Sequence, residues 1–153
     1  MAIDVTVQTT IERPVEVVFE RVVDLKAWPQ WLIASGITAV RRTGSAPIAP
    51  GDRLVVDQTA AGRSAIFAAE VATLEPPSRL AIRGRDDDGV TIEIEASLAG
   101  GDAATATILR WTIRVGLPLR YRVLEGMARP QVERAAALDL EALRRSLEST
   151  ASD

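Results

Sequence analysis

Alternating apolar and polar residues predict strands over most of the chain. In residues 3–11 every second residue is β-branched, the period of a strand with one buried face. Six further segments of strand-like composition follow, separated by short clusters of Gly, Pro and Asp: about 37–43, 53–59, 64–74, 79–85, 89–98 and 104–115. Breaks this short favour hairpins over crossovers, so the segments predict an antiparallel meander with one buried and one solvent-exposed face.

Three other segments carry apolar residues at helical spacing. The first runs from Pro14 to about Asp24 and the second, very short, from Pro29 to about Ala34, because proline suits the first turn of a helix. The third runs from about Pro130 to Leu147, after a connection over residues 117–122 whose form the pattern does not predict. The tail from Ser149 to Asp153 is expected to fray. The third helix carries an apolar stripe wide enough to lie across a sheet: Val132, Ala136, Leu140, Leu143 and Leu147.

The order of these elements predicts an α+β fold of the helix-grip type. One strand, two helices, six strands and a long helix (β-α-α-β6-α) form one core if a curved, seven-stranded antiparallel sheet wraps around the C-terminal helix. The length of 153 residues suits a single domain over residues 1–153. Where the helix stands off the concave face of the sheet, a pocket with a mostly apolar lining is expected.

Composition then limits the chemistry. The chain has no cysteine and no histidine, which excludes disulfides, thiolate nucleophiles and the commonest metal ligand. Any catalysis would have to use carboxylates, arginine, tyrosine, hydroxyls or backbone groups. The net charge of −3 and the scattered arginines argue against nucleic-acid binding. We expect a cytoplasmic protein without a membrane span, since no apolar run is long enough for one and the first residues lack a secretion signal.

The run Asp-Asp-Asp-Gly at residues 86–89 is the one stretch that resembles a metal loop. It lacks the distant glutamate of a calcium-binding loop, and Asp-Gly is ordinary chemistry for a hairpin tip. We therefore interpret it as a turn and expect neither a metal site nor a cofactor.

Several motifs together resemble the START-like, or SRPBCC, superfamily, and within it the polyketide cyclase/dehydrase group. The motifs cover nearly the whole chain: Ile11 to Phe19, Trp28-Pro29-Gln30-Trp31, Gly51-Asp52, Val71 to Leu80, and Leu138 to Leu143. Their combined order is specific for the fold and unspecific for activity. The resemblance implies a helix-grip fold that binds hydrophobic ligands, among them polyketides, sterols, quinones and plant hormones, and only some members of the superfamily are enzymes.

The aromatic residues are the first candidates for the site. Trp28 and Trp31 either roof the mouth of the pocket or dock the short helix onto the sheet, and we favour the docking role. Trp111 lies on the buried face of the last strand, where it serves equally well as cavity wall or as core. The candidate ligand-binding set is Trp28, Trp31, Phe67, Trp111, Tyr121, Met127, Ala136, Asp139 and Leu143.

Asp139 and Tyr121 are the candidates for chemistry. A partly buried Asp139 would have a raised pKa and shuttle a proton or pair with an arginine, whereas its ordinary role is that of a boundary residue that reaches water. Tyr121 lies near the expected entrance, together with Arg122 and Met127, where its hydroxyl would orient a ligand carbonyl. A tyrosine packed in a loop is the more ordinary interpretation.

Three functions remain open at this point. The first is binding of a hydrophobic or amphipathic small molecule, such as a polyketide, lipid or quinone-like compound, without chemistry. The second is a polyketide cyclase or aromatase/dehydratase, in which Asp139, Tyr121 and an arginine converge on the substrate. The third is a protein-interaction module. We expect a monomer or a weak homodimer.

Overall fold

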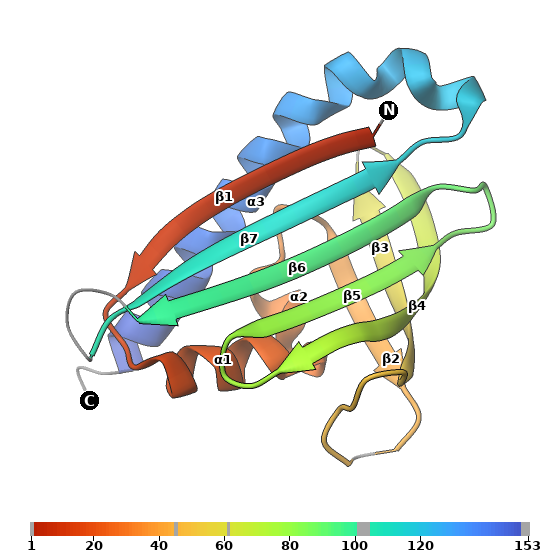
Figure 1. Cartoon of the computed structure of the whole chain (residues 1–153). Coiled ribbons are helices and arrows are strands. Elements are labelled where there is room, and N and C mark those ends of the chain that lie inside the picture. The colour runs from red at the N-terminus through yellow and green to blue at the C-terminus, as the bar shows by residue number, and fades with distance from the viewer. Residues whose placement is uncertain (1, 45, 61, 101–104, 151–153) are drawn as a thin grey trace.

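The computed structural model describes residues 2–44, 46–60, 62–100 and 105–150 (Figure 1). Seven strands form one antiparallel sheet in the order β1-β7-β6-β5-β4-β3-β2, which confirms the predicted fold class. The strands are β1 (Ala2–Ile11), β2 (Ile37–Arg42), β3 (Arg53–Ala60), β4 (Arg63–Glu75), β5 (Arg79–Arg85), β6 (Thr91–Gly100) and β7 (Thr107–Gly116). The first strand pairs with β7, the last strand of the meander, so β1 forms one edge of the sheet and β2 forms the other.

All the helices pack on one side of this sheet. They are α1 (Val15–Val23), the 3-10 turn η1 (Leu25–Ala27), α2 (Trp28–Trp31), the 3-10 helix η2 (Leu119–Leu124) and α3 (Glu125–Thr150). Figure 1 shows α3 running behind β1 and β7 along the length of the sheet. Within the described ranges, no helix combines the length and the apolar character needed to cross a membrane.

The predicted start of the long helix was wrong by five residues. The helical spacing of the apolar residues predicts a helix from about Pro130 to Leu147. In the structure the chain passes from η2 directly into α3 at Glu125, and Pro130 lies inside the helix. A proline there costs one backbone hydrogen bond, which the continuous η2–α3 segment tolerates.

The end of α3 also differs from the expectation of a frayed tail. The helix continues to Thr150, so Ser149 is helical, while residues 151–153 lie outside the described residues. The apolar stripe of α3 faces the sheet as its spacing predicts: Ala136, Leu140, Leu143 and Leu147 are all buried. The second half of α3 therefore closes the core.

Candidate functional site

A cavity of about 630 Å³ lies between the concave face of the sheet, η2 and the first half of α3. Its inner end is made of buried apolar side chains: Leu32, Ile37, Phe67, Ile94, Trp111 and Ile113. Its other end is bordered by exposed residues of three segments, and we call this end the mouth. These segments are the turn 33–36 after α2, the β3–β4 hairpin at Thr59, Ala60 and Arg63, and the η2–α3 segment at Leu124 and Gln131.

The polar side chains of the lining gather at the mouth. They are Ser35, Gln58, Thr59, Arg63, Tyr121 and Gln131. No aspartate or glutamate is among the described lining residues. Strand register explains why polar residues lie at the mouth and apolar residues lie deeper. Gln58 pairs with Ala65 near the tip of the β3–β4 hairpin, whereas Val56 pairs with Phe67 two residues further from the tip. The cavity thus has a hydrocarbon interior and a polar but largely uncharged entrance.

The turn 33–36 is bonded to β3. The Thr59 amide donates to the Gly36 carbonyl at 2.8 Å, and Gln58 Nε2 donates to the Ser35 carbonyl at 2.8 Å. Gly36 has a φ of +78°, and a Cβ at this position would lie 2.0 Å from the Thr59 carbonyl oxygen. Only glycine allows this close approach, which brings the turn against the strand at the mouth.

Asp139 fixes the same turn from the side of α3. Its carboxylate accepts the Ala34 amide at 2.8 Å and the Ser35 amide at 3.0 Å, and the residue is 1% exposed. Burial raises the pKa of this carboxyl, and the hydrogen bonds from Ser35 and Ala34 partly oppose the shift. Asp139 does not line the cavity, so the structure gives it the role of positioning the 33–36 turn.

The three tryptophans form one cluster at the inner end. Trp28 lies 5.7 Å and Trp31 lies 5.1 Å from Trp111, centroid to centroid, and all pairs meet edge to face. The Trp28 Nε1 group donates to the Val22 carbonyl at 2.9 Å, which ties α2 to the end of α1. Trp111 lines the cavity, whereas Trp28 and Trp31 lie behind it in the core.

The other predicted site residues also fall into two groups: some line the cavity and the others lie outside it. Phe67 and Tyr121 line the cavity, together with Trp111. Ala136 and Leu143 are buried on the face of α3 that contacts the core, beyond the cavity. Met127 is 70% exposed and points away from the lining. The structure therefore brings three of the nine predicted residues to the cavity wall.

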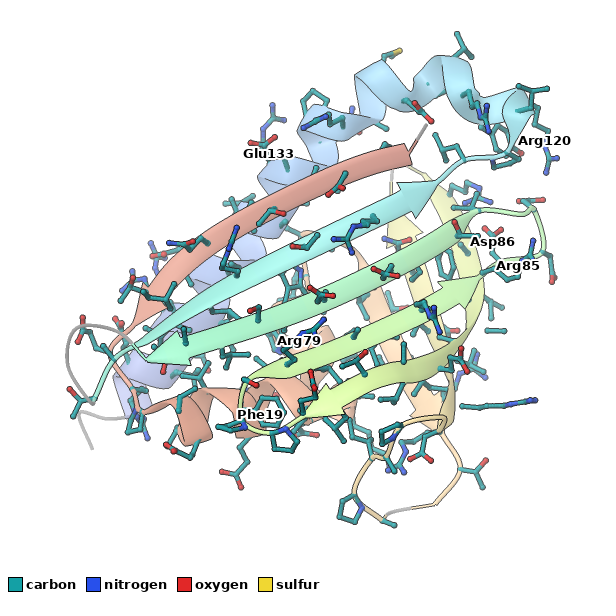
Figure 2. The ribbon with its side chains drawn as sticks, viewed as in Figure 1. Phe19, Arg79, Arg85, Asp86, Arg120 and Glu133 are labelled. Atoms are coloured by element: carbon teal, nitrogen blue, oxygen red, sulfur yellow. The ribbon has the colours of Figure 1, made fainter. Side chains whose placement is uncertain are left out.

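Sequence reasoning missed an ionic network at the mouth. Arg63 Nη2 lies 2.9 Å from Asp86 Oδ2 and 2.6 Å from Asp88 Oδ2, and Arg120 Nη2 donates to the Asp88 carbonyl at 2.6 Å. Figure 2 shows Arg120 and Asp86 at the same end of the molecule, from η2 and from the β5–β6 turn. The network joins three segments that are distant in sequence, and no local sequence pattern predicts it.

Asp86 is also the residue that organises the β5–β6 turn. Its Oδ1 accepts the amides of Asp88 at 3.0 Å and Val90 at 2.9 Å. Burial alone would raise the pKa of this carboxyl, but hydrogen bonds from Arg63 and from the turn amides outweigh it and lower the pKa. The run 86–89 is therefore a hairpin tip, as its turn chemistry predicts, with one carboxylate turned inward.

The outer face of the sheet carries a wide groove of about 1060 Å³ with a different character. Charged residues of alternating sign lie opposite one another across its strands: Asp4, Arg114, Glu93, Arg83, Glu70 and Arg53. These side chains are largely exposed, and such pairs stabilise a fold by at most about 1 kcal/mol each. This face is a solvated surface, and the apolar cavity remains the candidate site.

Solved structures of other proteins share the fold of this chain. The Zhui aromatase/cyclase from Streptomyces sp. R1128 has the same fold, with a TM-score of 0.77 over 97% of this chain and 94% of that chain, at 17% sequence identity. A START superfamily protein from Mycobacterium smegmatis superposes with a TM-score of 0.69 over 96% of this chain and 95% of that chain, at 20% identity.

A third structure is closer in sequence. DynU16, a protein of the dynemicin biosynthetic locus, is 28% identical with a TM-score of 0.65, and the match covers 97% of this chain but 48% of that chain. Among curated proteins, none matches the chain. The family model described as polyketide cyclase / dehydrase and lipid transport matches residues 2–148. The chain therefore belongs to this family.

Proposed function

We propose that this protein binds a hydrophobic or amphipathic small molecule, of the polyketide, lipid or quinone-like kind, in the cavity between the sheet and α3. The observation that carries the proposal is the cavity itself, whose volume of about 630 Å³ falls in the usual range of small-molecule sites. Its inner end is lined mainly by apolar side chains, and transfer of apolar area from water contributes about 25 cal/mol per Å². The name of the family, which joins polyketide chemistry and lipid transport, supports ligands of this type.

The chemistry of the lining supports binding more than catalysis. A cyclase of the type considered above would bring Asp139, Tyr121 and an arginine together on the substrate. Tyr121 and Arg63 line the cavity, but both carboxylate oxygens of Asp139 are engaged by the backbone of the 33–36 turn. Proton transfer by Asp139 would require it to release that turn. Arg63 is likewise held by two carboxylates.

A ligand screen tests the proposal directly. Thermal-shift measurements with lipids, aromatic polyketides and quinones should find at least one class that stabilises the protein, and native mass spectrometry should detect the complex. A ligand at about 100 times its dissociation constant adds about 2.7 kcal/mol, or roughly 5–10 °C for a domain of this size. Absence of any stabilisation and of any complex would contradict the proposal and favour a protein-interaction role.

A matched pair of variants on α3 shows whether binding uses this cavity. Ala135 lines the cavity and Ala137, on the same helix, is exposed. Ala135→Phe should fill the entrance and lower affinity at least about tenfold, because the added ring occupies ligand volume. Ala137→Phe adds the same ring on the solvent side and should leave affinity unchanged. Equal affinities for the two variants, measured by titration, would place the ligand elsewhere.

A further inference from the structure

We infer that the ligand of this cavity is an uncharged amphiphile, with an apolar body in the interior and a hydroxyl or carbonyl oxygen at the mouth. A ligand with a carboxylate head is therefore disfavoured, even though an arginine lines the entrance. This inference rests on the proposed function, since it names the class of molecule that the same cavity takes.

The first step is the free hydrogen-bonding capacity at the mouth. Gln58 uses its Nε2 group on the Ser35 carbonyl, which leaves the Gln58 Oε1 atom as an acceptor. The Tyr121 hydroxyl has no hydrogen-bond partner among the residues that the structure describes, and it can donate and accept. Neutral donors and acceptors of this kind suit a hydroxyl or a carbonyl, which gain directional hydrogen bonds without moving an ion out of water.

The second step is the charge at the mouth. Arg63 is the one lysine or arginine among the described lining residues, and it is already in contact with two carboxylates, Asp86 and Asp88. Arg120 approaches the same turn, with its Nη2 atom 3.9 Å from Asp88 Oδ1. The two arginines and the two aspartates of this network together carry no net charge. A ligand carboxylate would be a third anion at Arg63, with no uncompensated cation to repay its desolvation.

The third step is that Arg63 is held in this arrangement. Asp86 is buried and accepts two amides of its own turn, so it cannot turn away to release the guanidinium without breaking the β5–β6 hairpin tip. Asp88 is different, because its side chain is about half exposed and, among the residues that the structure describes, its carboxylate forms ion pairs with two arginines, Arg63 and Arg120. Asp88 is therefore the position at which the charge balance can be changed without loss of the fold.

Matched probes test the inference. We would titrate the protein with dansyl-tagged undecanoic acid and its methyl ester, and with anthraquinone-2-carboxylate and its methyl ester, at neutral pH and constant ionic strength. In each pair the apolar body is the same and only the charge differs. The ester should bind at least about tenfold more tightly than the acid in at least one pair, because the acid pays for desolvation of its charge.

Two substitutions in one turn provide the control. Asp88→Asn removes one anion from Arg63 and should shift the acid-to-ester affinity ratio about twofold to fivefold toward the acid, the range for a partly exposed ion pair. Asp87 is exposed and has no ion pair among the described residues, so Asp87→Asn changes the net charge equally without touching Arg63. This second variant should keep the wild-type ratio.

The outcomes separate this inference from the proposed function. Acids that bind the wild type as tightly as their esters in every pair that binds, or equal ratios in Asp88→Asn and Asp87→Asn, would overturn the inference and leave a binding cavity in place. Failure of all four probes, together with a negative screen, would contradict the proposed function itself. An ester preference that only Asp88→Asn weakens would establish the class of ligand.

Discussion

Replacement of Trp28 by alanine is expected to lower the free energy of unfolding by about 3–5 kcal/mol. The Trp28 side chain is fully buried, and its ring packs against both other tryptophans. Truncation removes this apolar area and leaves a cavity between α2 and the sheet. It also removes the indole N–H donor from the Val22 carbonyl, which weakens the tie between α2 and α1. Denaturant unfolding followed by far-UV circular dichroism measures the loss, since the change alters tryptophan fluorescence itself.

The control for this prediction is Trp28→Phe. It keeps an aromatic ring in the cluster and removes only the N–H donor and part of the volume, so its cost should be about 1–2 kcal/mol. Ligand affinity should change little in the folded part of either variant, because Trp28 does not line the cavity. A loss below about 1 kcal/mol for Trp28→Ala would show that the cluster is not a main source of stability.

Asp139→Ala is expected to have the second large effect, a loss of about 2–4 kcal/mol in unfolding free energy. The substitution leaves the part-buried Ala34 and Ser35 amides without their acceptors, and an unpaired donor costs about 1–3 kcal/mol where it is shielded from water. It should also weaken ligand binding, because the released turn 33–36 forms one side of the mouth. Asp139→Asn keeps one acceptor oxygen and should lose about half as much. Equal stability of Asp139→Ala and wild type would contradict this role.

The pH dependence of this carboxyl provides a separate check. Burial raises the pKa of Asp139 above its ordinary value of 3.8, so the folded state binds the proton more tightly than the unfolded state. The pH-dependent part of the contribution of Asp139 to stability is then fully present below pH 3.8 and is lost as the pH rises through the raised pKa, while the part due to its hydrogen bonds with the 33–36 turn remains. The stability difference between wild type and Asp139→Asn should fall over that window and stay level above it. A difference that grows with pH would contradict the sign of the shift.

Local patterns in the sequence were sufficient for most of the fold. The period-two alternation of residues 3–11 and of the later strands reflects burial on one face, and side-chain direction in a strand follows directly from position along the chain. The start of α3 was not predictable in this way, because Pro130 is compatible with both a helix start and the second turn. In the structure, η2 continues directly into α3 at Glu125, and this places Pro130 in the second turn of the helix.

The candidate site was only partly predictable, and the residues show why. Trp111 lies on the inner face of its strand, as the alternation of β7 predicts, and Phe67 lies on the inner face of β4. Alternation does not separate core from cavity wall, because both are buried and apolar. Ala136 and Leu143 share the inner stripe of α3, yet they lie where the helix touches the sheet. That boundary depends on how far the helix stands from the strands along its length.

Taken alone, the sequence determined the order of elements, the antiparallel sheet, the buried face of each strand and the absence of thiol and imidazole chemistry, since all of these follow from residue type and local spacing. The tertiary structure decided the roles of the charged and polar side chains. Asp139 contacts a turn more than a hundred residues away, and Arg63 meets Asp86 and Asp88 across two hairpins. Such contacts depend on distances between separate elements, which only the assembled sheet and helix set.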